Sequence, residues 1–108
     1  MEVFPQELLF YETANGSVPA REWLDAIEGR PEYGVIMARL EKVKQGSFGD
    51  YKAVGDGVCE LRVDFGPGYR VYYGRDGKDF VILLLGGMKK TQDADIKIAK
   101  KYWDDYNA

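Results

Sequence analysis

The stretch VCELRVDFGPGYRVYYGRDGKDFVILLL, residues 58–85, decides the fold class of this chain. In its first part apolar and polar residues alternate, which is the pattern of a strand with one buried face. The turn at 66–68 leads to a return strand over 69–74, and Asp76-Gly77 favours a second hairpin before a third strand over 79–85. The stretch therefore predicts three consecutive antiparallel strands.

Helix patterns lie on both sides of these strands. A strand over 3–12 precedes a helix that Ser17 is expected to cap, and apolar residues spaced by three and four predict a second helix over 31–45. A last helix follows Thr91. The predicted order is β-α-α-β-β-β-α in a single domain over 1–108. This is an α+β fold, and its first strand must join a mainly antiparallel sheet to be stable.

The composition narrows the chemistry that is available. The 108 residues include no histidine, which excludes the commonest general base, the commonest zinc ligand and any Ser-His-Asp arrangement. The single cysteine, Cys59, forms neither an internal disulfide nor a cysteine metal cluster. Any reaction must therefore use Lys, Arg, Tyr or carboxylate side chains, and we expect no metal and no other cofactor.

The charge is unevenly distributed along the chain. The net charge of −3 counts against a protein held to nucleic acid by bulk charge alone. However, residues 1–36 hold seven acids and two bases, whereas residues 37–101 hold thirteen bases and nine acids. The longest apolar run, 80–85, is far shorter than the ~20 residues that span a bilayer, and no secretory leader precedes the first strand. We therefore expect a cytoplasmic protein that does not bind membranes.

The strand pattern predicts a polar group on the face of the sheet that points away from the core. With Phe65 opposite Tyr69 across the Gly-Pro-Gly loop, Arg62 lies opposite Tyr72, and Arg70 falls on the same face. In the second hairpin, the two-residue turn places Tyr72 opposite Val81 and Arg70 opposite Leu83. The prediction is a cluster of Arg62, Arg70 and Tyr72 over a partly apolar floor.

The same pattern can also be explained without a ligand-binding site. The same register places Asp64 opposite Arg70, and such a surface ion pair contributes only ~0–1 kcal/mol to stability. An arginine stacked on a tyrosine in solvent is equally ordinary. Both interpretations of the face remain open at this point.

The segment GGMKKTQD, residues 86–93, follows the third strand and opens the last helix. Its two glycines are expected to end the strand and to let a ligand approach the backbone, while Lys89 and Lys90 add positive charge near a helix N-terminus. The spacing of a Walker loop is absent. A phosphate site is one interpretation, and a solvated strand-to-helix turn is the other.

Four segments together carry a resemblance to a known family. They are GDYK (49–52), GVCELR (57–62), GPGYRVYY (66–73) and LLGGMKKTQDADI (84–96). In this order and spacing they resemble the HigB-like addiction-module killer proteins, also described as phage-derived, of the RelE/ParE toxin superfamily. The resemblance implies a RelE-like α+β fold and ribosome-dependent mRNA cleavage. It also implies restraint by a cognate antitoxin, which we expect to be a small helix-turn-helix protein.

The resemblance also implies roles for individual residues. Arg62 and Arg70 would stabilise the phosphate as the RNA 2′-OH attacks it, and Lys52 or Tyr72 would transfer protons. Which of these groups is the base stays open. The implied RNA-binding residues are Lys89, Lys90, Tyr73 and Gln92.

Two other functions fit the same features. The ParE branch of the superfamily acts on DNA gyrase and needs no nuclease residues. A non-catalytic interaction module would use the sheet face or its grooves to hold a partner chain. The sign of such a module would be an Arg70 neutralised by Asp64, with Lys52 pointing away.

Overall fold

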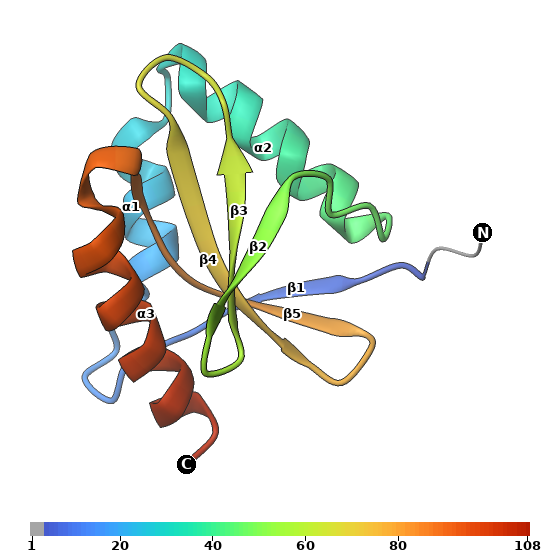
Figure 1. The fold of residues 1–108 in the computed structure, drawn as a ribbon, viewed down its shortest axis with the longest axis vertical. Helices are drawn as coiled ribbons and strands as arrows, with labels where there is room; N and C mark the ends of the chain where they lie inside the picture. Colours follow the sequence, from blue (N-terminus) through green and yellow to red (C-terminus); the bar gives the residue numbers. More distant parts are fainter. Residues whose placement is uncertain (1–3) are drawn as a thin grey trace.

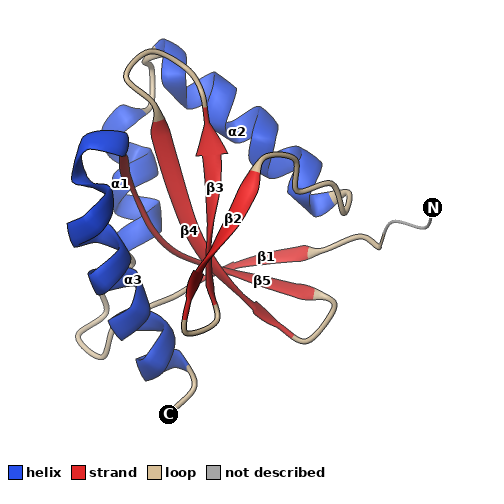
Figure 2. Cartoon of the chain, in the orientation of Figure 1, coloured by secondary structure: helices blue, strands red, loops and turns tan. Residues whose placement is uncertain are grey.

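The computed structural model describes residues 4–108, which form a mixed five-stranded sheet with three α-helices (Figure 2). In chain order the elements are β1 (Glu7–Phe10), α1 (Pro19–Ile27), α2 (Pro31–Lys44), β2 (Tyr51–Gly55), β3 (Val58–Val63), β4 (Tyr69–Asp76), β5 (Phe80–Met88), the 3-10 helix η1 (Lys89–Thr91) and α3 (Gln92–Tyr106). The strand order is β1-β5-β4-β3-β2. Only β1 pairs in parallel, with β5, so the predicted α+β class and mainly antiparallel sheet are confirmed.

Strand β2 is absent from the predicted order, which is therefore corrected to β-α-α-β-β-β-β-α. The strand is short and mostly exposed, so it lacks the alternation by which strands are recognised. The sequence nevertheless contains a turn signal that predicts a hairpin at this place. Asp56 and Gly57 join β2 to β3 with φ angles of 56° and 85°, as in the Asp-Gly turns that favour hairpins. The predicted start of the first strand at Val3 lies outside the described residues.

The hairpin of β3 and β4 has a loop two residues longer than predicted. Phe65 belongs to this loop instead of pairing with Tyr69. Arg62 therefore lies directly opposite Arg70, and the predicted pairing of Arg62 with Tyr72 is wrong. Because a shift of two residues preserves the face of every side chain, the two arginines and Tyr72 still share one face of the sheet.

The register of β4 against β5 also differs from the prediction. The turn between these strands holds three residues instead of two, since Asp76 pairs with Phe80. An additional irregularity between Tyr72 and Tyr73 shifts the register by one more residue. The predicted pairs Tyr72–Val81 and Arg70–Leu83 are replaced by Tyr72–Leu85 and Arg70–Gly87.

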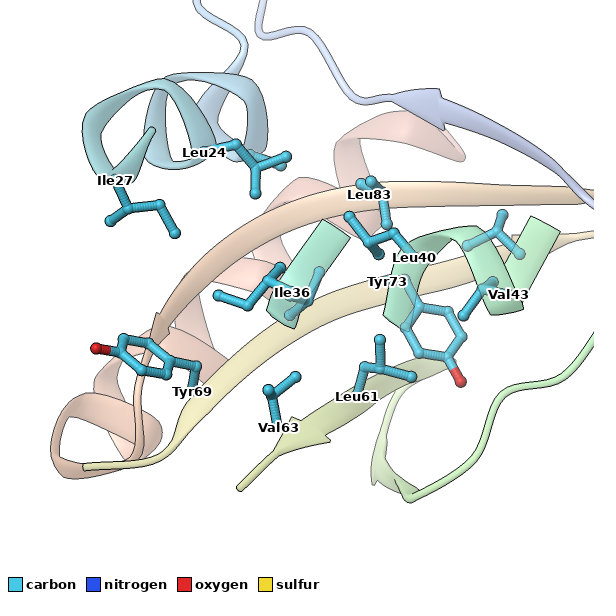
Figure 3. Close-up of a cluster of buried hydrophobic side chains, with 13 residues drawn as sticks. Leu24, Ile27, Ile36, Leu40, Val43, Leu61, Val63, Tyr69, Tyr73 and Leu83 are labelled. Atoms are coloured by element: carbon cyan, nitrogen blue, oxygen red, sulfur yellow. The ribbon is translucent and has the colours of Figure 1, made fainter. Parts of the chain in front are cut away.

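Helices cover both faces of the sheet (Figure 1). Helices α1 and α2 pack on one face over the larger hydrophobic cluster, in which Ile36 and Leu61 are almost completely buried (Figure 3). Helix α3 packs on the other face over a smaller cluster that includes Tyr72 and Ala99. No helix of the described chain has the length and apolar character required to cross a membrane.

The helix ends agree only in part with the predicted caps. Helix α1 begins one residue later than a Ser17 cap requires, with Val18 at the N-cap. The Glu22 carboxylate accepts hydrogen bonds from the Val18 amide and the Ser17 hydroxyl, both at 2.9 Å, and so takes over the role of the cap. Helix α2 ends at Lys44, one residue before the predicted end at position 45. The glycine with positive φ that follows it is Gly46.

Gly86 and Gly87 lie inside β5, so the prediction that they end the strand is wrong. Both glycines allow a helix to approach the sheet closely. A Cβ atom at Gly86 would overlap the Trp23 ring of α1, and one at Gly87 would overlap the Asp95 carboxylate of α3. These two glycines therefore set the distance between the sheet and the helices on either side of it.

The C-terminal half of α3 is attached to the sheet by two tyrosine–carboxylate hydrogen bonds. The Tyr11 hydroxyl donates to Asp105 at 2.6 Å, and the Tyr106 hydroxyl donates to Asp76 at 2.7 Å. Burial and the Asp105 carboxylate raise the pKa of Tyr11 from 10.0 to about 12. Ionisation of this phenol would break the hydrogen bond and place two negative charges side by side.

Stability should consequently fall in alkaline solution. A phenol with a raised pKa in the folded state stabilises the fold fully below pH 10, and this contribution is lost as the pH rises to about 12. We expect Tyr11→Phe to make the urea midpoint less sensitive to pH between about 10 and 12. Tyr51→Phe, at an exposed position, is the control and should retain the wild-type dependence. If the urea midpoint of Tyr11→Phe fell with pH as steeply as that of the wild type, Tyr11 would not be the group whose ionisation destabilises the fold.

Candidate functional site

A cluster of polar side chains crosses the sheet on the face that α3 covers. Lys52 of β2, Glu60 of β3 and Tyr72 of β4 occupy successive positions of one cross-strand row. Arg62 and Arg70 form the neighbouring row. Together with Gln92 at the start of α3, these residues make up what we call the Glu60 cluster. Five of its six members come from strands whose register brings them together across the sheet.

Glu60 is the centre of the cluster and is completely buried, with 0% exposure. Its Oε1 accepts a hydrogen bond from Arg62 Nε at 3.0 Å, and Arg62 Nη2 lies 3.0 Å from the same oxygen. Gln92 Nε2 donates to both carboxylate oxygens, at 2.9 and 2.7 Å. A buried carboxylate requires such partners, because removing an unpaired charge from water costs several kcal/mol.

Arg70 is held differently and is only 5% exposed. Its Nε lies 3.9 Å from Glu60 Oε2, and its Nη1 donates to the Tyr69 carbonyl at 3.0 Å. Among the described residues, Arg70 pairs with Glu60, while Asp64 is exposed. The predicted Asp64–Arg70 ion pair is therefore wrong, because the longer loop removes Asp64 from the position opposite Arg70.

Two buried polar atoms of the cluster have no hydrogen-bond partner within residues 4–108. They are Arg70 Nε and the Tyr72 hydroxyl. Burial raises the pKa of Tyr72, and the nearby Glu60 carboxylate raises it further, so the phenol stays protonated at neutral pH. A protonated phenol and a guanidinium N–H are both donors, and both suit an oxyanion or a water molecule as partner.

The lysine of the cluster and the two lysines of η1 are exposed. Lys52 is exposed on β2, and Lys89 and Lys90 are exposed on η1. The Lys89 amide donates to the Gly68 carbonyl at 3.0 Å, which joins the turn after β5 to the loop before β4. A Cβ on Gly68 would lie 3.3 Å from Lys89 Cβ and 3.7 Å from Arg70 Nη1. Lys89 thus lies near Arg70, as its predicted position implies.

Tyr73 lies apart from the other predicted site residues. It points to the opposite face of the sheet, where it belongs to the core under α1 and α2 and is buried. Its ring stacks on Phe48 with the centroids 5.7 Å apart. Since the ring is enclosed by protein, it cannot stack on an RNA base in this structure. The alternation of β4 predicts this placement once Tyr72 is assigned to the other face.

Glu60 is the member of the cluster that residue-by-residue reasoning missed. It is part of the ELR motif and alternates with Leu61, so its face was predictable. Lys52 and Tyr72 are the predicted groups for proton transfer, and no role is predicted for Glu60. The signal that was available is the spacing of Glu60 and Arg62, two residues apart on one strand and therefore on one face.

Within the six residues of the cluster, Lys52, Arg62 and Arg70 outnumber the single carboxylate of Glu60, while Asp93 and Asp95 of α3 lie near Tyr72. Two guanidinium groups share one buried carboxylate, and exposed lysines flank them. Arginine presents donors in a planar fork that fits phosphate oxygens. The arrangement is therefore suited to binding an anion with several oxygens.

Comparison with known proteins gives the family. A family model described as phage derived protein Gp49-like (DUF891) matches residues 22–104, which include the whole Glu60 cluster. The chain belongs to this Gp49-like family. Gp49-like proteins are a family of RelE/HigB-like toxins. An uncharacterized protein of Haemophilus influenzae is 49% identical to this Gp49-like chain over 78 residues, which are 72% of this chain and 79% of the relative.

Proposed function

We propose that this Gp49-like protein is a HigB-like toxin of a type II toxin–antitoxin pair. In this proposal it acts in the cytoplasm as a ribosome-dependent mRNA endoribonuclease and needs no metal or other cofactor. The observation that carries the proposal is the direct cross-strand pairing of Arg62 with Arg70, flanked by exposed lysines. Membership of a toxin family supports the first part of the proposal.

The arginine pair suits the transition state of RNA cleavage. The 2′-OH attacks the adjacent phosphorus, its proton leaves, and the 5′-oxygen departs with a proton as a 2′,3′-cyclic phosphate forms. The phosphate gains negative charge during this step, and preorganised donors aimed at that charge are the largest source of acceleration in such sites. Arg62 and Arg70 would supply these donors.

Proton transfer falls most naturally to Lys52. Lys52 is exposed in the row beside Glu60, whereas Tyr72 is completely buried beneath α3. The raised pKa of Tyr72 keeps this phenol protonated at neutral pH, so it is not available as a base but can donate a hydrogen bond. In this assignment Lys89 and Lys90 hold the RNA backbone, and the ribosome supplies the remaining contacts to the mRNA.

The proposal is tested by expressing the protein from a tightly controlled promoter in a bacterial host. We expect growth arrest together with cleavage of mRNA on translating ribosomes, mapped by primer extension. Co-expression of the adjoining gene, which we expect to encode a helix-turn-helix antitoxin, should restore growth. Arrest with intact mRNA would refute the nuclease proposal.

A second candidate is a toxin or module that acts by binding a protein. The observation that favours it is the burial of Arg70 and Tyr72 under α3, with Glu60 neutralising part of the positive charge. A ParE-like gyrase inhibitor would arrest growth with intact mRNA and a loss of DNA supercoiling. An interaction module would cause no arrest. The same expression experiment therefore separates the three functions.

A further inference from the structure

We infer that Glu60 is a positioning residue, which holds Arg62 and Arg70 in the orientation that binds a phosphate. The inference rests on the proposed function for its catalytic consequence, but its structural part can be measured without cleavage. It assigns a role to the one buried acid of the cluster, which accepts hydrogen bonds from Arg62 and Gln92 and lies within ion-pair distance of Arg70.

The two arginines need a partner in order to lie side by side. Like charges directly opposite one another on neighbouring strands destabilise a sheet. Arg62 and Arg70 occupy such positions, and the Glu60 carboxylate contacts Arg62 through Oε1 and approaches Arg70 through Oε2. One carboxylate therefore bridges two guanidinium groups, by a hydrogen bond to Arg62 and by a longer ion pair, without a hydrogen bond, to Arg70.

Gln92 completes the arrangement without adding charge. Its amide donates to both oxygens of Glu60 from the first residue of α3. The carboxylate is thereby prevented from rotating, and its oxygens are occupied by protein donors. Glu60 in this state is poorly placed to accept a proton from a 2′-OH, so orientation of the arginines explains its burial better than a role as general base.

The bridge leaves donors free for a ligand. Arg62 directs its Nε and Nη2 toward Glu60, and its side chain remains 32% exposed. Asp93 and Asp95 of α3 add negative charge near Tyr72, so the feature that would bind a phosphate is the oriented guanidinium fork and not the net charge. A phosphate would therefore meet guanidinium groups whose orientation is already set before it binds.

The variant Glu60→Gln separates orientation from charge. Removing the negative charge makes the site more positive, so a site that works by charge alone would bind RNA more tightly and cleave it no more slowly. A positioning role predicts the opposite effect on the rate. We expect kcat for mRNA cleavage on ribosomes to fall about 10- to 100-fold with KM unchanged or lower.

A spectroscopic measurement tests the orientation directly. In the wild-type protein the guanidinium Nε–H group of Arg62 should give a resolved signal in ¹H–¹⁵N NMR, because it donates a hydrogen bond to Glu60. Titration with inorganic phosphate should shift this signal. In Glu60→Gln the signal should broaden or move to the position of a solvent-exposed arginine, and its response to phosphate should weaken. Glu41→Gln on the exposed surface of α2 is the control and should leave the signal unchanged.

A second variant covers the case in which Glu60→Gln fails to fold. Gln92 is half-buried at a helix start, and Gln92→Ala retains the charge of Glu60. If Gln92 steadies the carboxylate, its loss should lower kcat several-fold and shift the Arg62 Nε–H signal. If Gln92 instead contacts RNA, KM should rise with kcat and the signal unchanged, and the inference would be overturned.

The remaining outcomes are also decisive. An unchanged Arg62 signal in Glu60→Gln would overturn the inference, as would a gain in cleavage, since the latter would make Glu60 an inhibitory group. A wild-type protein that does not cleave mRNA would refute the proposed function alone. In that case the phosphate titration of wild type and Glu60→Gln still decides whether Glu60 positions the arginines.

Discussion

Replacement of Arg70 by alanine is expected to abolish growth arrest and to lower the rate of mRNA cleavage about 10²- to 10³-fold. Arg70 pairs directly with Arg62 across β3 and β4, and its Nε is a buried donor without a partner in residues 4–108. Removing it deletes half of the guanidinium pair that we propose to stabilise the transition state. The rate should be measured on translating ribosomes under single-turnover conditions.

Two control variants make this result specific. Arg75→Ala removes an arginine from the same strand, where it lies over the Phe48 ring with the guanidinium carbon 4.7 Å from the centroid, and it should cleave normally. Arg70→Lys retains the charge but loses the planar fork, so it should recover only a small part of the rate.

The Arg70→Ala protein should still fold. Glu60 retains its hydrogen bonds from Arg62 and Gln92, so the variant does not leave an unpaired buried carboxylate. Circular dichroism and the thermal midpoint should confirm this. Wild-type cleavage by a folded Arg70→Ala protein would refute the proposed site.

The largest effect on stability is expected at Gly86. A Cβ atom at this position would overlap the Trp23 ring, which packs over β5 from α1. Gly86→Ala must therefore displace either the ring or the helix, and we expect it to reduce the free energy of unfolding by about 1–3 kcal/mol. Urea denaturation monitored by tryptophan fluorescence and circular dichroism gives this value.

A double-mutant cycle identifies the cause of that loss. In the background of Trp23→Ala the ring is absent, so Gly86→Ala should cost much less than it does alone. Gly34→Ala provides the opposite control. Gly34 lies within α2 with no atom near its missing side chain, and alanine there should stabilise the helix by roughly 0.5–1 kcal/mol. An equal cost of Gly86→Ala in both backgrounds would show that Trp23 is not the obstacle.

The elements with strong periodicity were predictable, and the connections between them were not. Alternation in β3 and the spacing of apolar residues in α2 place both elements within a few residues of their observed bounds. The errors lie in the loops, in the unpredicted short strand β2 and in the end of β5, which extends through Gly86 and Gly87. Phe65 satisfies an alternating pattern but belongs to a longer loop, and the turn after Asp76 holds one residue more than its Asp-Gly signal predicts. Loop length depends on backbone conformations that alternation does not encode.

In the candidate site, likewise, the face of each side chain was predictable from the sequence and its partners were not. The shared face of Arg62, Arg70 and Tyr72 follows from alternation within each strand and survives a shift of two residues. The cross-strand partner of each residue, in contrast, changes with that shift of two residues. Asp64 is lost as a partner of Arg70, and Glu60 takes its place because the observed register brings its carboxylate beside both arginines.

The residues available for chemistry are a property of the amino-acid sequence. A chain without histidine and with one cysteine must rely on Arg, Lys, Tyr and carboxylates, whatever its fold. Which of these charges remain free for a ligand depends on the tertiary structure, because burial and pairing between strands are set by register and by the helix above. The sequence shows Glu60 only as an acid within the ELR motif. Its partners are set by the tertiary structure, in which Gln92 of α3 donates to it and the register of β3 and β4 places two arginines beside it.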